Sequence, residues 1–219
     1  MNSDKTLAVL LIVAIVVAVA GIYLNLTKLQ QISGFASSGN VSVNITRQVS
    51  ITLTDSTCDF GQGYVTAPYA YAELYFNGTQ VVTNNWTATS APTPPGIVVR
   101  NDGNVDIYVC IKPSKNTSTL FGGGTSSRQF YGFWVSEKET GSCGGGRSLS
   151  NKASFSSIPS NPGTAMCYAP TIEKPLQPQD QADEVYVNCY LKISDDTPPG
   201  LKNDTWTFTA QTTACGVIT

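Results

Sequence analysis

The sequence predicts a mainly β protein, in which a long N-terminal hydrophobic α-helix is followed by an antiparallel β-sandwich. Three observations support this prediction: an unbroken apolar run near the N-terminus, apolar residues at every second position from residue 40 onward, and six scattered cysteines. We expect residues 1–34 to form a short cytoplasmic head and the helix. Residues 35–219 would form one extracellular domain with a long Gly/Ser/Pro-rich loop at 136–182.

The hydrophobic run from Leu7 to Leu24 contains no charged or amide side chain. Its length is close to the ~20 residues that cross a bilayer and exceeds the ~7–15 apolar residues of a cleaved export signal. The small residues around Ala18, Ala20 and Gly21 nevertheless resemble a cleavage site, so a cleaved signal stays open. Membrane contact is therefore expected through residues 7–24.

The helical period continues beyond this run through Ile22, Leu26, Leu29 and Ile32 until Gly34, a residue suited to end a helix. We therefore expect one helix from about Thr6 to Ser33, part of which projects beyond a bilayer. Small residues allow helices to approach closely, and they recur here at Ala14, Ala18 and Gly21.

Strands are predicted where apolar and polar residues alternate. In the first such stretch the apolar positions are Val41, Val43, Ile45, Val49, Ile51 and Leu53, and only Arg47 interrupts them. Further strands are expected at 64–76, 80–86, 96–100, 105–112, 129–135, 184–193 and 204–213. The stretch IVVRNDGNVDIYVCI is typical of a hairpin, with its turn at 101–104.

The six cysteines predict disulfides in an oxidising compartment. The chain has no histidine and no Cys-x-x-Cys pair, which argues against zinc. Cys110 shares a polar strand face and Cys189 an apolar one, so a bond between them is disfavoured. We favour Cys143 with Cys167, because both lie in the long loop, and leave the pairing of the other four cysteines, which include Cys58 and Cys215, open.

N-glycans are expected partners, because the acceptor pattern Asn-x-Ser/Thr recurs along the domain at Asn40, Asn44, Asn77, Asn85, Asn116 and Asn203. The disulfides and acceptor sites together predict that everything after Gly34 lies outside the cell. Nucleic acid is not an expected partner, because the net charge is −2 and no basic cluster is present.

Catalytic chemistry is not predicted. The absence of histidine removes Ser-His-Asp and Cys-His arrangements, and the Gly-rich stretches lack the context of a phosphate-binding loop. Asp102, Asn104 and Asp106 superficially resemble a calcium loop but lack its remaining ligands, so a plain turn is the simpler interpretation. We therefore expect no metal, no cofactor and no enzymatic activity.

The order of these features resembles that of archaeal type IV pilins and archaellins: a short charged head, MNSDK, an apolar helix that continues amphipathically, and a β-domain rich in glycan acceptors. This resemblance implies a homopolymer whose helices bundle in the core of a filament, with the sandwich displayed outside. The sequence departs from the family at the processing site, where Lys5-Thr6 replaces the usual charged residue followed by Gly or Ala.

A second resemblance concerns DDTPPGLKNDTWTFTA at 195–210, which is similar to the last hairpin of immunoglobulin-like modules in prokaryotic surface proteins. Two interpretations follow for the whole chain. The first is a structural subunit of a surface filament. The second is a single-pass, membrane-anchored glycoprotein that binds or adheres through an immunoglobulin-like sandwich.

Overall fold

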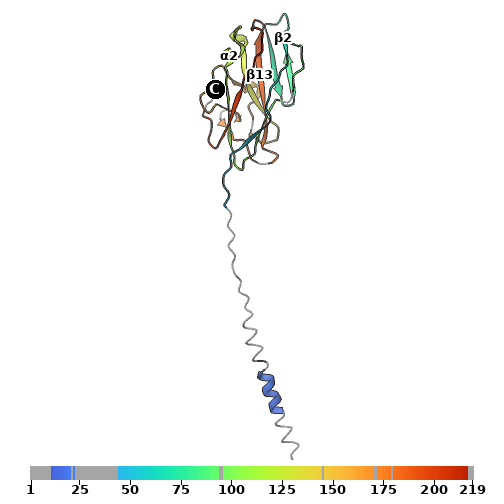
Figure 1. Ribbon diagram of the computed structural model, residues 1–219, viewed down its shortest axis with the longest axis vertical. Helices are drawn as coiled ribbons and strands as arrows, with labels where there is room; N and C mark the ends of the chain where they lie inside the picture. The colour runs from blue at the N-terminus through green and yellow to red at the C-terminus, as the bar shows by residue number, and fades with distance from the viewer. Residues whose placement is uncertain are drawn as a thin grey trace, which may run out of the picture. The chain divides into compact units, whose positions relative to one another are not determined.

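A computed structural model describes residues 11–20, 22, 44–93, 96–144, 146–169, 172–178 and 180–216. The chain divides into two units, Met1–Ile45 and Thr46–Thr219. The described β-strands all lie in the second unit, where they form antiparallel sheets (Figure 1). The prediction of a mainly β protein is confirmed.

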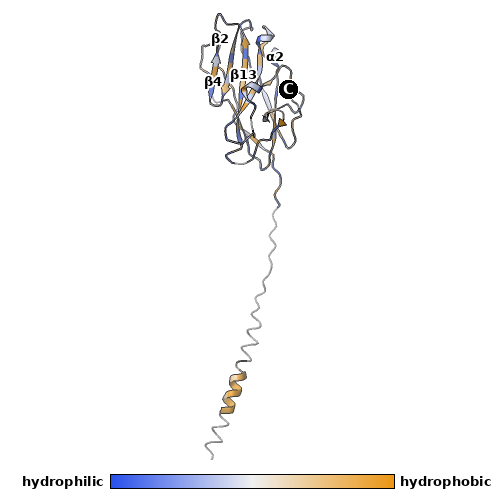
Figure 2. Cartoon of the chain, turned by 180° about the vertical axis from the view of Figure 1, so that it is seen from behind, coloured by the Kyte–Doolittle hydropathy of each residue, from blue (hydrophilic) through white to orange (hydrophobic). Residues whose placement is uncertain are grey.

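In the first unit, the described residues 11–20 and 22 are helical. The rest of the helix predicted from Thr6 to Ser33 lies outside the described residues. Ala14 and Ala18 are exposed on this helix, whereas Gly21 is not described. Every described turn is apolar (Figure 2). Within the part of the chain that the structure describes, no helix has both the length and the hydropathy needed to cross a bilayer.

The larger sheet is built around β13 (Glu184–Ser194), the longest of the described strands. One edge of β13 pairs along most of its length with β8 (Phe130–Glu137). The short β9 (Ala153–Ser154) pairs in turn with β8. The other edge pairs first with β6 (Ile97–Asn101) and then with β3 (Tyr71–Asn77). Outside these two lie β1 (Ile51–Asp55) and β4 (Gln80–Asn84), respectively.

The smaller sheet has the order β10-β7-β14, from Thr164–Ala165, Tyr108–Pro113 and Trp206–Gln211. Inward-facing residues of both sheets form one buried cluster, which includes Val185 and Val187 of β13 and Val109 and Ile111 of β7. Two sheets that enclose one core form a β-sandwich. The alternation predicted for β13 is correct, because Val185, Val187 and Cys189 join this core.

The predicted hairpin at 97–111 is wrong. β6 pairs with β1 and β13, whereas β7 pairs with β10 and β14, so the chain crosses from one sheet to the other between them. The buried side chain of Asn101 donates to the carbonyl oxygens of Val105 and Leu176, both at 3.0 Å. Turn residues between two alternating stretches therefore marked a corner between sheets rather than a tight hairpin.

Of the alternating stretch predicted from residue 40 as two strands or one bent strand, residues 40–43 lie outside the described residues. β1 begins at Ile51, and the described residues 44–50 are not in a strand. Residues 46–50 are instead held to the 101–104 turn: the Asn104 side chain accepts from the Gln48 N–H (2.7 Å) and donates to the Thr46 carbonyl (2.9 Å). Asn104 thus positions neighbouring backbone.

The predicted 64–76 strand is also divided, into β2 (Gly63–Val65) and β3, by a turn that contains Pro68. β2 pairs with β5 (Trp86–Ala88) as a separate two-stranded ribbon. β3 and β4 form a hairpin through Gly78, whose φ of 62° suits a two-residue turn.

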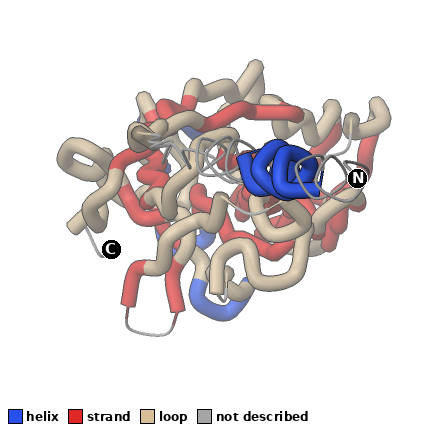
Figure 3. The backbone as a smooth tube through the Cα atoms, turned by 90° about the horizontal axis from the view of Figure 1, so that it is seen from below, coloured by secondary structure: helices blue, strands red, loops and turns tan. Residues whose placement is uncertain are grey.

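The stretches predicted as loops contain ordered elements. Residues 113–128 include α2 (Thr117–Phe121), capped by Asn116, and a 3-10 helix at Ser126–Arg128. Residues 136–182 include a 3-10 helix at Leu149–Asn151, β9, β10 and a ribbon of β11 (Tyr168–Ala169) with β12 (Ile172–Glu173). Long connections still surround the strands (Figure 3), but Phe155 and Met166 anchor the second stretch in the core.

Candidate functional site

A cleft of about 930 Å³ lies between the end of β1 and the start of β14. One rim consists of residues 56–63, which follow β1. The other consists of residues 200–205, which lead into β14. Leu120 of α2 and Trp86 of β5 also line it. Its volume lies within the range of ~300–1,000 Å³ found for ligand sites.

The floor of the cleft is the apolar core itself. Leu74, Ile97 and Cys189 are buried and line the cleft, as do the half-buried Leu191 and Ile193. The Cys58–Cys189 disulfide, with a Cα–Cα distance of 6.3 Å, attaches the first rim to β13 and fixes the width of the cleft at that point. The site is therefore suited to apolar side chains.

Polar groups of the second rim already have partners within the domain. The Asp204 carboxylate accepts from the Tyr131 hydroxyl (2.6 Å), the Lys115 N–H (3.2 Å) and the Ser114 hydroxyl. The Tyr131 hydroxyl also accepts from the Trp206 indole, and burial, followed by its bond to Asp204, raises the Tyr131 pKa. Lys202 donates to the Phe121 carbonyl (2.6 Å). These groups hold the rim against α2 and its surroundings.

Two sheet edges border the cleft. β1 pairs only with β6 and β14 only with β7 among the described strands, so each has one edge without a ladder partner. The chemistry that the cleft offers is therefore apolar burial combined with backbone hydrogen bonds, which is the basis of strand addition.

The six cysteines form three disulfides, as predicted: Cys58–Cys189, Cys110–Cys215 and Cys143–Cys167. The third is the pairing favoured from the sequence. The other two had been left open. Cys110 lies on the face of β7 opposite the main core, as the alternation predicts, but it is buried under Ala165 and the C-terminal segment.

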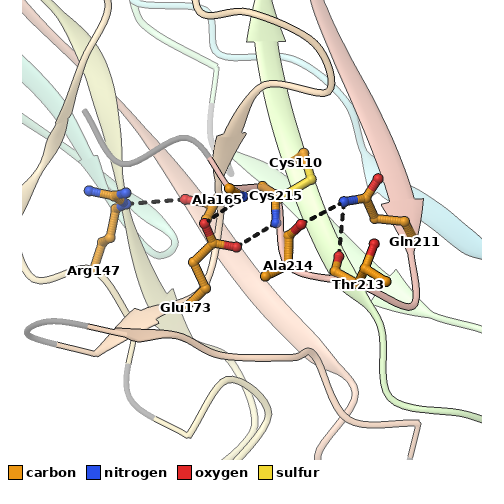
Figure 4. Close-up of a disulfide and its surroundings, with 9 residues drawn as sticks. Cys110, Arg147, Ala165, Glu173, Gln211, Thr213, Ala214 and Cys215 are labelled. Carbon is orange, nitrogen blue, oxygen red and sulfur yellow. Dashed lines mark hydrogen bonds between the residues drawn. A yellow bond between two sulfur atoms is a disulfide. The ribbon is translucent and has the colours of Figure 1, made fainter.

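The C-terminal segment is fixed by more than its disulfide (Figure 4). The Glu173 carboxylate accepts from the backbone N–H groups of Cys215 (2.5 Å) and Gly216 (2.9 Å). The buried Arg147 donates to the Ala165 carbonyl (3.2 Å) and lies 4.5 Å from the Tyr168 ring centroid. Burial lowers the pKa of this guanidinium. Sequence patterns did not predict this arrangement, because it depends on contacts between distant segments.

The glycan acceptor sites differ in accessibility. Asn44, Asn77 and Asn203 are exposed. Asn116 is half-buried and caps α2 by accepting from the Thr119 N–H (2.9 Å), and the half-buried Asn85 donates its amide to the Tyr71 carbonyl (3.4 Å). Asn40 lies outside the described residues. Asn203 stands directly on the cleft rim.

Groups of three or more cysteine, aspartate or glutamate residues that could hold a metal are absent from the described ranges. Comparisons with protein-family models, with curated proteins and with solved structures gave no match. Three disulfides indicate an oxidising environment, which is consistent with a secreted or surface protein. The fold is a disulfide-bonded, mainly β sandwich.

Proposed function

We propose that this chain is a structural subunit of an extracellular, pilus-like filament. The N-terminal helix of each copy packs against the helices of other copies to form the spine, and an immunoglobulin-like sandwich bearing N-glycans is displayed outside. The function is assembly, and no catalysis is required of the domain.

One observation carries this proposal. Large apolar side chains surround the described part of the helix, and each is 54–66% exposed: Leu11, Ile12, Val13, Ile15, Val16, Val17, Val19 and Ile22. A helix that is apolar on every side requires apolar surroundings on every side. In a bundle of identical helices, Ala14, Ala18 and Gly21 would allow close approach.

The second candidate function is that of a single-pass, membrane-anchored surface glycoprotein, because the same apolar residues would also be satisfied by lipid. It is favoured by the run from Leu7 to Leu24, which carries no charged or amide side chain. In that case the sandwich would serve adhesion or binding.

The double variant Ala14→Leu/Ala18→Leu distinguishes the two functions. It keeps the helix apolar and so preserves membrane insertion, but it removes the small surfaces that a helix bundle needs. We expect abundant surface protein with few filaments, measured by electron microscopy and by the amount released on shearing.

Leu11→Val/Val13→Leu provides the matched control, because it rearranges apolar volume without altering the small residues. Filaments of normal number and length in the Ala14→Leu/Ala18→Leu variant, with the protein in the sheared fraction, would contradict a spine of this kind. Protein found only in the detergent phase in both variants would favour the membrane anchor.

A further inference from the structure

The free edge of β14 lacks the features that usually protect an edge strand. Its sequence, WTFTAQ, contains no charged residue and no proline, and its pairing with β7 is regular over six residues. β1, across the cleft, has a register irregularity between Leu53 and Asp55 and carries that aspartate. Bulges and charges discourage pairing with another strand, so β14 is the more receptive edge.

The cleft lies directly beside this edge. Trp206 and Phe208 of β14 line it, and the floor is apolar. A strand added to β14 would form main-chain hydrogen bonds with that edge and place every second side chain in the cleft. The site therefore accepts an extended segment with apolar residues at alternate positions, uncharged and without proline where it enters the cleft.

The chain contains such a segment. In sequence, Val41, Val43 and Ile45 alternate with Asn40, Ser42 and Asn44, and the stretch 40–46 has no charge, glycine or proline. Ile45 is 78% exposed. The alternating polar residues would face away from the cleft, so glycans on Asn40 and Asn44 are compatible with insertion.

The same copy is a poor source of this strand. Residues 46–53 run extended along the 99–104 edge, with Asp102 N–H donating to the Ser50 carbonyl (3.1 Å) and Leu53 opposite Val99. Leu53 is the first residue along this segment that lines the cleft. An extended chain rises ~3.3 Å per residue, so Leu53 lies about 23 Å from Thr46. Residues 41–45 span at most about 17 Å and would also have to reverse direction.

Figure 1 shows where these segments lie within the domain. Within the domain, α2 and β2, which belong to the cleft end, lie at one end, and the blue segment 46–50 lies at the other. We propose that residues 41–45 of one copy add as a strand to the β14 edge of a second copy and fill its cleft with Val41, Val43 and Ile45. This contact does not depend on the helical spine.

A photo-reactive residue at position 45 of the full-length chain tests the proposal. Isotopically heavy and light copies would be mixed in detergent and irradiated, and cross-linked peptides identified by mass spectrometry. We expect heavy–light pairs that join position 45 to residues 56–63 or 200–208. Cross-links confined to one copy, cross-links to other surfaces, or none at all would overturn the proposal.

A pair of surface variants gives the specificity control. Leu201 is 88% exposed on the cleft rim, and Ile172 is 61% exposed on β12, outside the cleft lining. Leu201→Asp should lower the heavy–light yield about tenfold, while Ile172→Asp leaves it unchanged. Equal yields in both variants would count against the cleft. Heavy–light cross-links in a protein that forms no filaments would support this contact between copies and would refute the proposed helical spine.

Discussion

Removal of the Cys110–Cys215 disulfide should destabilise the domain more than removal of Cys143–Cys167. The two bonds close segments of very different length, with sequence separations of 105 and 24 residues. A disulfide stabilises largely by restricting the unfolded chain, and the effect grows with the logarithm of the closed length. The chain-entropy relation gives about 4.7 kcal/mol for the longer closure and about 3.4 kcal/mol for the shorter one.

The comparison is well matched in the folded state, because all four cysteines are buried: Cys110 and Cys143 at 0% exposure, Cys167 at 2% and Cys215 at 5%. The double variants Cys110→Ala/Cys215→Ala and Cys143→Ala/Cys167→Ala therefore lose similar packing. A difference of about 1.3 kcal/mol between them should come from the unfolded state.

The assay is urea unfolding of the full-length chain, followed by tryptophan fluorescence, with free energies extrapolated to water. The six-cysteine protein measured with and without reductant supplies the upper limit of the total disulfide effect. Equal losses, or a larger loss in the Cys143→Ala/Cys167→Ala variant, would refute the reasoning. Local packing of the 136–182 segment would then dominate over chain entropy.

Two further predictions concern the polar groups of the domain. Tyr131→Phe should lower the free energy of unfolding by about 1–3 kcal/mol, because it removes the partner of both Trp206 and the Asp204 carboxylate; urea unfolding that matches the wild-type protein would contradict this. Burial, and then the hydrogen bond to Glu139, raises the pKa of Asp183 to about 6. Since a raised carboxyl pKa favours the protonated folded form, wild-type stability should decline modestly as pH rises from about 4 to about 6, whereas Asp183→Asn should lack that decline. Urea midpoints that shift in parallel for the two proteins across this range would show that Asp183 is not responsible.

The sequence was most informative where a strand has neighbours on both sides and a clear apolar face. In β13, Val185, Val187 and Cys189 enter the core, and the predicted bounds of 184–193 fall one residue short of the strand end. In β8, Tyr131 and Phe133 enter the core while Trp134 donates to the Phe76 carbonyl on the other face. Alternation alone is sufficient to identify the core face of β13, whereas β8 carries large apolar residues on both faces.

The sequence was least informative about which strands become neighbours. Asn101 and Gly103 are typical of a tight turn, yet they lie at a corner between sheets, because the Asn101 side chain bonds to Leu176, far away in sequence. The cleft escaped prediction for the same reason, since its two rims are separated by more than 100 residues. Local patterns report what a segment can form, whereas pairing depends on the distant segments that surround it.

Strand pairing that local patterns do not predict can also occur between copies, as a comparison of β13 with residues 40–45 suggests. Both segments alternate, but Val185 and Val187 find a core within their own copy, whereas Ile45 remains exposed. An alternating segment becomes a stable strand when its apolar side chains are buried. A segment that has the pattern without burial therefore needs a neighbouring surface that buries these side chains. The cleft beside β14 has the complementary property, an apolar site next to a strand edge without a ladder partner. A single association between copies would satisfy both, and the alternation at 40–45 would then describe the assembled protein rather than the isolated chain.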